Sequence, residues 1–209
     1  MQIARKFKQN SLEKKLSMRY NKYRYLRKDR YEMENRIENL GFKRIDPDNL
    51  SKLEFNPFKM IGKDWMLVSA GDESGWNTMT ASWGFMGVMW GKNVVTTVIR
   101  PQRYTKEFID NSEYFTLCFF DEDQRAALAY CGKYSGRDVD KAKETGLTPV
   151  FTDGTTAFEQ AKTIIVCRKM YSQDMNPECF IDKSADEQWY PNKDYHTAYI
   201  AEITAVYVK

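Results

Sequence analysis

The stretch Gly75-Trp-Asn-Thr-Met-Thr-Ala-Ser-Trp-Gly84 decides how the rest of this chain is interpreted. It places four small hydrogen-bonding side chains within six residues: Asn77, Thr78, Thr80 and Ser82. Trp83 ends the run, and a later β-branched run ends in Arg100-Pro-Gln-Arg-Tyr-Thr105. Small polar groups can bind the edge of a flat ligand, an indole can cover its face, and guanidinium groups can hold a phosphate. The combination predicts a site for a flat, polar, phosphorylated ligand.

Less specific interpretations of the same residues stay open. The first segment can be a strand whose polar side chains face water after a turn at 72–75, and the second can be a solvated basic turn with Thr105 as a helix N-cap. A third segment, Ser135-Gly-Arg-Asp-Val-Asp-Lys141, allows a tight loop in which Asp138 caps a helix that carries Lys141. It can equally be a charged surface loop.

The 209 residues divide into a basic helical N-terminal extension, residues 1–40, and one domain, residues 41–209. Residues 1–32 hold 11 Lys and Arg against 3 Asp and Glu, so the remainder holds 21 basic and 26 acidic residues of the chain's 32 and 29. Apolar residues recur every three to four positions up to Leu40, which predicts an amphipathic helix that stops at Gly41. The domain itself is therefore acidic, and no nucleic-acid partner is expected for it.

Several alternatives concern the extension alone. A heptad interpretation as a coiled coil is weak because it puts Arg19 and Arg30 on the seam. Translation can also start at Met33, which would leave residues 1–32 outside the native protein. A third hypothesis makes residues 1–32 a basic arm for nucleic acid or an acidic partner, with interleaved tyrosines that stack on bases.

Cys118, Cys131, Cys167 and Cys179 are too far apart in sequence for a metal knuckle or a redox pair, and His196 is the only histidine. We expect no metal site. Isolated thiols are typical of a reducing cytoplasm, and Cys118 and Cys167 lie in apolar runs that favour a core position. No apolar run is long enough for a signal h-region or a membrane span, so a cytoplasmic protein without a membrane partner is expected.

The pattern of the domain predicts a mainly β structure with short helices. Six strand-like runs are found, at 65–70, 79–83, 94–99, 114–120, 163–172 and 197–208. Short helices are predicted between them at 105–110, 123–130 and 138–145, with Asp123 as a second N-cap. Strands without a βαβ rhythm favour a closed or partly closed antiparallel barrel.

These residues closely resemble flavin reductase-like proteins with an FMN-binding split barrel, in particular the flavoredoxin-type branch. The resemblance runs from about Leu40 to Lys209, through Cys131–Lys141, Gly146–Phe151 and Trp189–His196. It implies a six-stranded Greek-key split β-barrel, bound FMN and a homodimer. The implied activity is that of a flavin-dependent oxidoreductase, with electrons from NAD(P)H or a small electron-carrier protein passing through FMN to an acceptor. The alternative is a flavin-binding electron carrier with little NAD(P)H turnover.

The resemblance also implies site residues, all of them cofactor-binding and none catalytic: Asn77, Thr78, Met79, Thr80, Ser82, Trp83, Arg100, Tyr104, Thr105, Ser135, Gly136 and Lys141. Those from 77 to 83 would lie along the isoalloxazine ring, and Arg100, Tyr104 and Thr105 at the phosphate. Arg103 and Arg137 are possible additions. Phe85 departs from the family's usual glycine and is expected to narrow the pocket beyond Trp83. His196 is a candidate for the pocket wall, and Trp189 and Tyr190 for a loop near the dimer interface.

Overall fold

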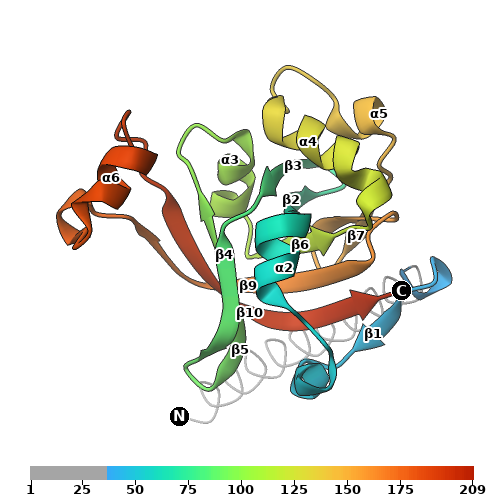
Figure 1. Cartoon of the computed structure of the whole chain (residues 1–209). Coiled ribbons are helices and arrows are strands. Elements are labelled where there is room, and N and C mark those ends of the chain that lie inside the picture. Colours follow the sequence, from blue (N-terminus) through green and yellow to red (C-terminus); the bar gives the residue numbers. More distant parts are fainter. Residues whose placement is uncertain (1–36) are drawn as a thin grey trace, which may run out of the picture.

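One antiparallel sheet organises residues 37–209, the part of the chain that the computed structural model describes (Figure 1). Its eight strands are β1 (Lys43–Ile45), β2 (Met66–Asp72), β3 (Gly75–Ala81), β4 (Gly84–Met89), β5 (Lys92–Ile99), β6 (Tyr114–Phe119), β9 (Thr163–Asp174) and β10 (Thr197–Val208). The hydrogen-bonded order is β3-β2-β6-β9-β10-β5-β4, and β1 pairs with β10. A separate hairpin joins β7 (Pro149–Thr152) to β8 (Thr155–Phe158).

The sheet is a barrel that does not close. Its two end strands, β3 and β4, follow each other in sequence and are linked only by Ser82 and Trp83, yet they are not neighbours in the described sheet. Strands β6, β9 and β10 pair in succession and β5 returns beside β10, which is a Greek key. The six predicted strands are therefore β3, β2, β6, β9, β10 and β5, side by side, and the predicted split-barrel fold is confirmed.

Four strands were not predicted: β1, β4, β7 and β8. β1 has three residues, and β4 contains Gly84 and Gly87, which weaken a strand pattern. The β7–β8 hairpin did carry a signal, since its turn is Asp153-Gly154 and both residues have positive φ (49° and 72°). An Asp-Gly pair with that geometry is a typical two-residue hairpin turn.

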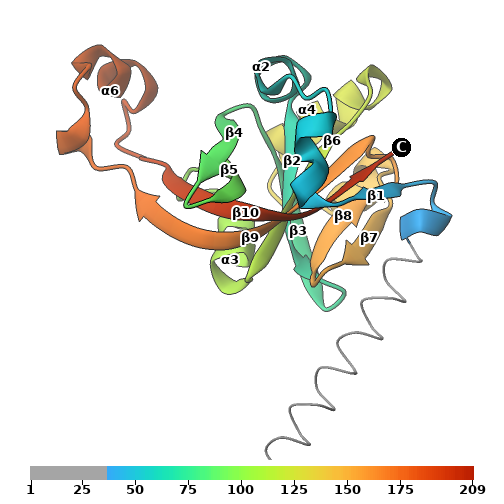
Figure 2. The ribbon, with the colours of Figure 1, turned by 90° about the horizontal axis from the view of Figure 1, so that it is seen from below.

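Short helices connect the strands. They are α2 (Pro57–Lys59), α3 (Tyr104–Asn111), α4 (Arg125–Lys133), α5 (Lys141–Thr145) and α6 (Lys183–Trp189), with the 3-10 helices η1 (Pro47–Lys52), η3 (Glu122–Gln124) and η4 (Pro177–Cys179) and the π-helical turn η2 (Met60–Asp64). α6 was not predicted. It lies at the end of an arm formed by β9 and β10, far from α4 and α5 (Figures 1 and 2).

The three predicted N-caps are wrong. α3 begins one residue early, at Tyr104, so Thr105 lies inside it and its hydroxyl accepts a hydrogen bond from Asn77. Asp123 lies inside η3, which precedes α4. α5 is capped by Asp140, whose side chain accepts from the backbone N–H of Lys143, because the helix starts later than predicted.

Two apolar clusters hold the sheet. The first fills the barrel and includes Met66, Phe115 and Tyr199, and the second includes Phe158 and Tyr207. β10 contributes to both, because a register shift between Ile203 and Ala205 moves its alternating side chains from one cluster to the other. Strict alternation would put residues 199 to 207 on one face, but a bulge reverses the alternation after residue 203.

The predicted N-terminal helix, the coiled coil and the basic arm lie outside the described residues, except at the end of the helix. Gly41 has a φ of 87°, and its N–H donates to the carbonyl of Glu38 at 2.9 Å, so the predicted stop is confirmed. Cys118 and Cys167 are fully buried, as expected, and all four cysteines are free thiols. Across residues 37–209, no helix has the length and apolar character needed to cross a membrane.

Candidate functional site

Two adjoining cavities lie where β3, α3 and the segment after α4 meet. The larger, about 490 Å³, is called the basic cavity and is lined by Asn77, Met79, Arg100, Gln102, Arg103, Tyr104, Thr105, Gly132, Lys133, Tyr134, Ser135, Gly136 and Lys141. The smaller, about 300 Å³, is called the aromatic cavity and is lined by Met79, Thr80, Ala81, Ser82, Trp83, Val98, Arg100, Arg103, Trp189 and His196. Met79, Arg100 and Arg103 line both, so the two cavities are adjacent and share these side chains as a wall.

The predicted site residues come together here with one exception. Every one of them except Thr78 lines one or both cavities. Thr78 is buried instead: its hydroxyl lies 2.7 Å from the hydroxyl of Ser69, and its carbonyl oxygen accepts a hydrogen bond from Lys141. The side chain of Thr78 points to the opposite side of β3 from Asn77 and Met79, where Ser69 of the neighbouring strand β2 pairs with it.

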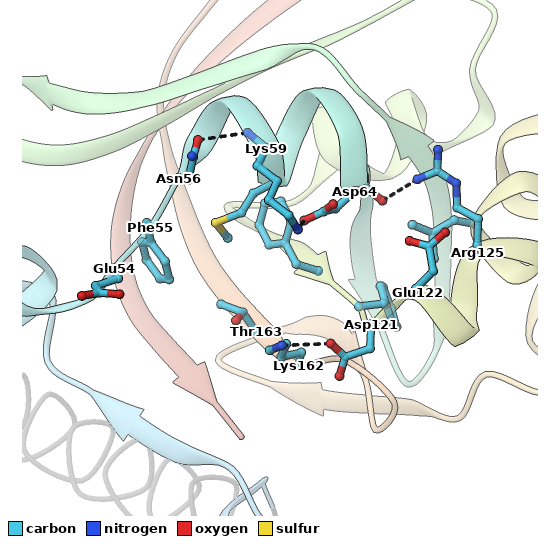
Figure 3. Close-up of a pocket in the computed structure, with 14 residues that line it drawn as sticks. Glu54, Phe55, Asn56, Lys59, Asp64, Asp121, Glu122, Arg125, Lys162 and Thr163 are labelled. Atoms are coloured by element: carbon cyan, nitrogen blue, oxygen red, sulfur yellow. Dashed lines mark hydrogen bonds and ion pairs between the residues drawn. The ribbon is translucent and has the colours of Figure 1, made fainter.

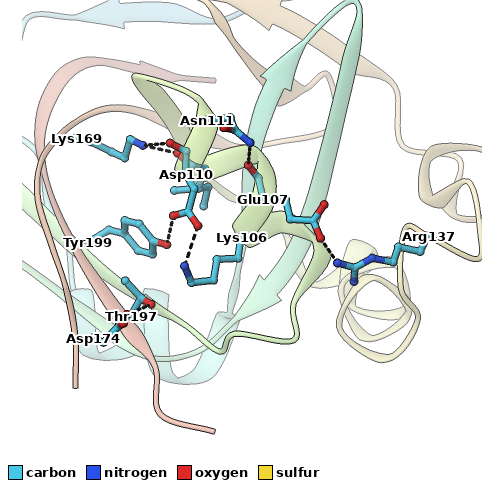
Figure 4. A network of polar contacts seen from close by, with 10 residues as sticks. Lys106, Glu107, Asp110, Asn111, Arg137, Lys169, Asp174, Thr197 and Tyr199 are labelled. Carbon is cyan, nitrogen blue, oxygen red and sulfur yellow. Dashed lines mark hydrogen bonds and ion pairs between the residues drawn. The ribbon is translucent and has the colours of Figure 1, made fainter. Parts of the chain in front are cut away.

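A polar network fixes α3, whose first turn lines the basic cavity (Figure 4). The buried Tyr199 of β10 donates its hydroxyl to Asp110 at 2.6 Å, and Lys106 donates to the same carboxylate at 2.8 Å. Lys169 of β9 donates to the carbonyls of Ile109 and Asp110, near the helix C-terminus, where a cation is favoured. The helix is thus attached to the barrel at its far end, and its N–H groups face the cavity.

Lys141 is the buried cation of the site. Its side chain is 6% exposed although its ammonium group carries a charge at neutral pH. The ammonium donates to the carbonyls of Thr78 at 2.7 Å and Cys131 at 2.8 Å, which leaves one of its three hydrogens for the basic cavity. Burial lowers its pKa from 10.5 to about 8, a net value that includes a smaller opposing effect of Cys131 and a smaller lowering by Arg103.

Close packing makes Gly136 necessary. A Cβ atom at this position would lie 2.0 Å from Oδ1 of Asn77. Asn77 is itself fixed, because its Nδ2 donates to the hydroxyl of Thr105 at 2.9 Å. The Ser-Gly loop can therefore approach β3 and α3 closely enough to form one wall of the basic cavity.

The two shared arginines have different partners. Arg100 forms an ion pair with Asp194 at 2.5 Å and donates to the carbonyl of Trp189 at 2.8 Å, so it holds the segment that follows α6. Arg103 donates to the carbonyl of Gly132 at 2.7 Å. Burial, and then Arg100, lower the pKa of Arg103 from 12.5. Arg103 is therefore the guanidinium with more remaining donors for a ligand in the basic cavity.

Three aromatic rings define the aromatic cavity. Trp83 packs edge-on against Trp189, with ring centroids 4.9 Å apart, and lies 5.3 Å from the ring of His196. His196 is nearly buried, and its Nδ1 lies 2.7 Å from the hydroxyl of Tyr190. Burial and then Arg100 lower the pKa of His196 from 6.5 to about 4, so it is neutral at pH 7.

Phe85 does not have the predicted effect. Its side chain is 61% exposed on β4 and lines neither cavity. Trp189, and not Phe85, narrows the space beside Trp83, since its ring packs on that of Trp83. The residues that sequence reasoning did not name are Ala81, Val98, Gln102, Gly132, Lys133 and Tyr134. Lys133 and Tyr134 directly precede the Ser135–Lys141 segment, so extending that segment by two residues would have found them.

A third cavity, about 420 Å³, lies beside α2 and the start of α4 (Figure 3). Its cations are already paired: Lys59 with Asp64 at 2.5 Å, and Lys162 with Asp121 at 2.9 Å. Arg125 donates to the carbonyl of Asp64 at 3.0 Å. Its lining holds four carboxylates and three cations, whereas the charged groups that line the basic cavity are all cations. No group of His, Cys, Asp and Glu within residues 37–209 is arranged to hold a metal ion.

Comparison with known proteins agrees with this geometry. The family model of the flavin reductase-like domain matches residues 59–209, and the chain belongs to this family. Its structure is similar to flavoredoxin of Desulfovibrio vulgaris (Miyazaki F), with 22% sequence identity, a TM-score of 0.54 and 69% of each chain covered. No curated protein matches the sequence.

Two other solved structures share the fold. One is an FMN-binding domain of a flavin reductases-like enzyme from Shewanella baltica OS155, with 15% identity and a TM-score of 0.56, covering 80% of this chain and 76% of that one. The other is the styrene monooxygenase flavin reductase from Pseudomonas putida S12, with 17% identity and a TM-score of 0.50, covering 68% of this chain and 77% of that one. At these identities the similarity establishes the fold.

Proposed function

We propose that this protein is an FMN-binding oxidoreductase that passes electrons from NAD(P)H or an electron-carrier protein through the flavin to an acceptor. The observation that carries the proposal is the pair of adjoining cavities, one cationic and one aromatic. FMN has the matching form, a phosphate at one end and a flat, polar ring system at the other.

The basic cavity fits the phosphate. Its lining contains four cations and no carboxylate: Arg100, Arg103, Lys133 and Lys141. The first turn of α3 adds backbone N–H groups, and a helix N-terminus favours an anion. Lys141 and Arg103 would hold the phosphate from the buried side, since both are anchored by carbonyls and still have free donors. Ser135 and Gly136 would form the facing wall.

The aromatic cavity fits the ring. Backbone and hydroxyl groups of Thr80 and Ser82 would bind its polar edge, Met79 would contact it between the two cavities, and Trp83 would exclude water from its surroundings. The bound flavin supplies the electron transfer, and the protein's part is to orient it and tune its potential. No residue of the chain is needed as an acid or base, in keeping with the neutral His196.

The proposal includes a homodimer in the cytoplasm. The β4–β5 hairpin exposes four large apolar side chains in sequence proximity: Phe85 (61%), Val88 (75%), Met89 (42%) and Trp90 (55%). Contiguous exposed apolar surface is typical of protein–protein interfaces, which supports a second copy as partner. Four free thiols support a reducing compartment. Light scattering of the purified protein at several concentrations tests the dimer.

The second candidate is an electron carrier with little NAD(P)H turnover. Trp189 favours it, because this ring occupies the mouth of the aromatic cavity beside Trp83, where a nicotinamide would have to enter. Anaerobic oxidation of NADH and NADPH by the FMN-loaded protein separates the two functions. Bleaching of the flavin by either nucleotide supports the reductase, and bleaching by neither supports the carrier.

The cofactor assignment is tested first, by the absorption spectrum of the purified protein and by titration with FMN and riboflavin. Binding of FMN much tighter than of riboflavin supports the phosphate role of the basic cavity. A Lys133→Met variant is the matched control for Lys141→Met, because Lys133 lines the same cavity at its exposed rim. A colourless protein that binds neither flavin refutes the proposal.

A further inference from the structure

Tyr190 lies directly behind the aromatic cavity. It is 3% exposed, stacks on Tyr195 with ring centroids 4.9 Å apart, and has Arg100 5.1 Å above its own ring. Its hydroxyl has two partners: Nδ1 of His196 at 2.7 Å and Sδ of Met175 at 3.3 Å. Tyr190 is not part of either cavity lining, so it acts on a ligand only through His196.

The single proton of the phenol can go to only one of these partners. A thioether sulfur is a weak acceptor, whereas the unprotonated nitrogen of an imidazole is a strong one. The distance of 2.7 Å is also typical of an O–H donor, since N–H donors lie at about 2.9–3.0 Å from oxygen. Nδ1 of His196 therefore accepts, and a neutral ring then carries its own proton on Nε2.

The surroundings of His196 keep the ring neutral. The charged and titratable groups that face it are Arg100, Arg103, Asp194 and Tyr190. Burial and the two arginines lower its pKa to about 4, and Asp194 opposes them less strongly. The phenol remains protonated as well, because burial raises the pKa of Tyr190.

The Nε2 edge of His196 faces the aromatic cavity. His196 is one of the residues lining that cavity, and its Nδ1 is turned away to Tyr190. Within residues 37–209, Nε2 has no hydrogen-bond partner. It is not fully buried either, so it is accessible from the cavity. Its donor is thus directed to whatever occupies the cavity beside Trp83.

We propose that Tyr190 is a positioning residue that fixes the Nε2–H tautomer of His196, so that His196 donates a hydrogen bond to a carbonyl or carboxamide oxygen of the substrate that stacks on the flavin beside His196. The substrate class rests on the proposed function, because it assumes a planar partner that stacks near the flavin. The tautomer does not, because it follows from the protein's own contacts. Anionic substrate groups are bound by the arginines, whereas His196 selects an uncharged acceptor.

The tautomer can be measured directly, since His196 is the only histidine in the chain. Protein labelled with ¹⁵N-histidine gives one imidazole in a long-range ¹H–¹⁵N correlation spectrum, and we expect a protonated Nε2 and an unprotonated Nδ1 at pH 7. Tyr190→Phe keeps the ring and removes the donor, so both tautomers should appear and the pKa of His196 should rise. A wild-type protein with its proton on Nδ1, or a Tyr190→Phe variant with an unchanged imidazole, overturns the proposal.

Two control variants separate the phenol's role from packing. Tyr195→Phe removes a neighbouring hydroxyl that bonds to Asp186, and it should leave the imidazole unchanged. Met175→Leu removes the competing sulfur and should also preserve the Nε2–H form. A tautomer change in Met175→Leu would show that the phenol donates to sulfur, which contradicts the assignment.

The substrate class is tested with NADH and its thioamide analogue, whose sulfur is the poorer acceptor. His196→Asn and Tyr190→Phe should each lower kcat/KM for NADH about fivefold through KM, which is the effect of one neutral hydrogen bond. With the thioamide analogue as substrate, the two substitutions should lower kcat/KM little further. Equal losses for both nucleotides refute the carbonyl contact, whereas a protein that binds no flavin refutes the proposed function and leaves the tautomer result standing.

Discussion

Lys141→Met should separate ligand binding from stability. The folded protein lowers the pKa of this lysine from 10.5 to about 8, and each pKa unit corresponds to 1.36 kcal/mol, so holding the charged form costs the folded state roughly 3 kcal/mol at neutral pH. Methionine removes that cost but leaves the carbonyls of Thr78 and Cys131 without their donor, at about 1–3 kcal/mol each. The two effects partly cancel, so the free energy of unfolding of the flavin-free protein should fall by no more than about 3 kcal/mol.

The affinity for FMN should fall selectively. One charge-assisted hydrogen bond contributes about 1.5–3 kcal/mol, which corresponds to a loss of roughly 10- to 150-fold in affinity. Riboflavin lacks the phosphate, so Lys141→Met should leave its affinity almost unchanged. Lys133→Met removes an equal charge from the exposed rim and should reduce FMN affinity by a few-fold at most.

The pH dependence gives the sharpest assay. The lysine of the flavin-free folded protein loses its proton near pH 8, so the FMN affinity of the wild type should fall as the pH rises from 7.5 to 9.5, by up to tenfold per pH unit. The phosphate is already a dianion in this range and adds no slope. Flavin fluorescence titration should show this fall in the wild type and in Lys133→Met, and a flat profile in Lys141→Met. A flat wild-type profile, or equal losses for FMN and riboflavin, would refute the reasoning.

Three further changes probe the packing and the charges. Gly136→Ala should lower the free energy of unfolding by about 1–3 kcal/mol in denaturant titrations, since the new methyl group would lie 2.0 Å from Asn77, and unchanged stability would contradict the close approach. The pKa of His196 is about 4 in the folded protein and 6.5 in the unfolded chain, so the unfolded chain binds a proton first as the pH drops. The free energy of unfolding should therefore fall by up to roughly 3 kcal/mol between pH 6.5 and pH 4. The His196→Gln variant should lose this pH dependence. Tyr199→Phe should lower the free energy of unfolding by about 1.5–3 kcal/mol, because it removes the buried hydrogen bond to Asp110. Flavin affinity should change little if Lys169 keeps α3 attached to the barrel.

Local sequence patterns predicted the strands that carry the site. The period-two alternation of residues 197–208 and the β-branched run before Arg100 correspond to β10 and β5. The resemblance to a known family then named residues from three distant segments, and the fold brings those segments together around two cavities. Whether they bind FMN stays a prediction.

What the sequence could not reveal depends on side chains that meet across long separations. Nothing near Thr105 indicates that its hydroxyl bonds to Asn77 rather than capping a helix. Nothing near Trp189 indicates that this ring packs on Trp83, because α6 is placed by the long β9–β10 arm. Nothing near Tyr190 and His196 indicates their hydrogen bond or the contact of Arg100, which follows β5, with the ring of Tyr190.

The unpaired ends of the sheet have a consequence for stability. β3 and β4 leave a seam in the barrel wall, and residues on both sides of it, Thr80 on one and Val98 on the other, line the aromatic cavity. A ligand in this cavity would contact residues of β3 and β5, which belong to opposite ends of the sheet. Ligand binding and barrel integrity are then coupled thermodynamically, and the occupied protein resists unfolding more as the ligand concentration rises. If FMN occupies the cavity as proposed, the cofactor would also stabilise the folded barrel.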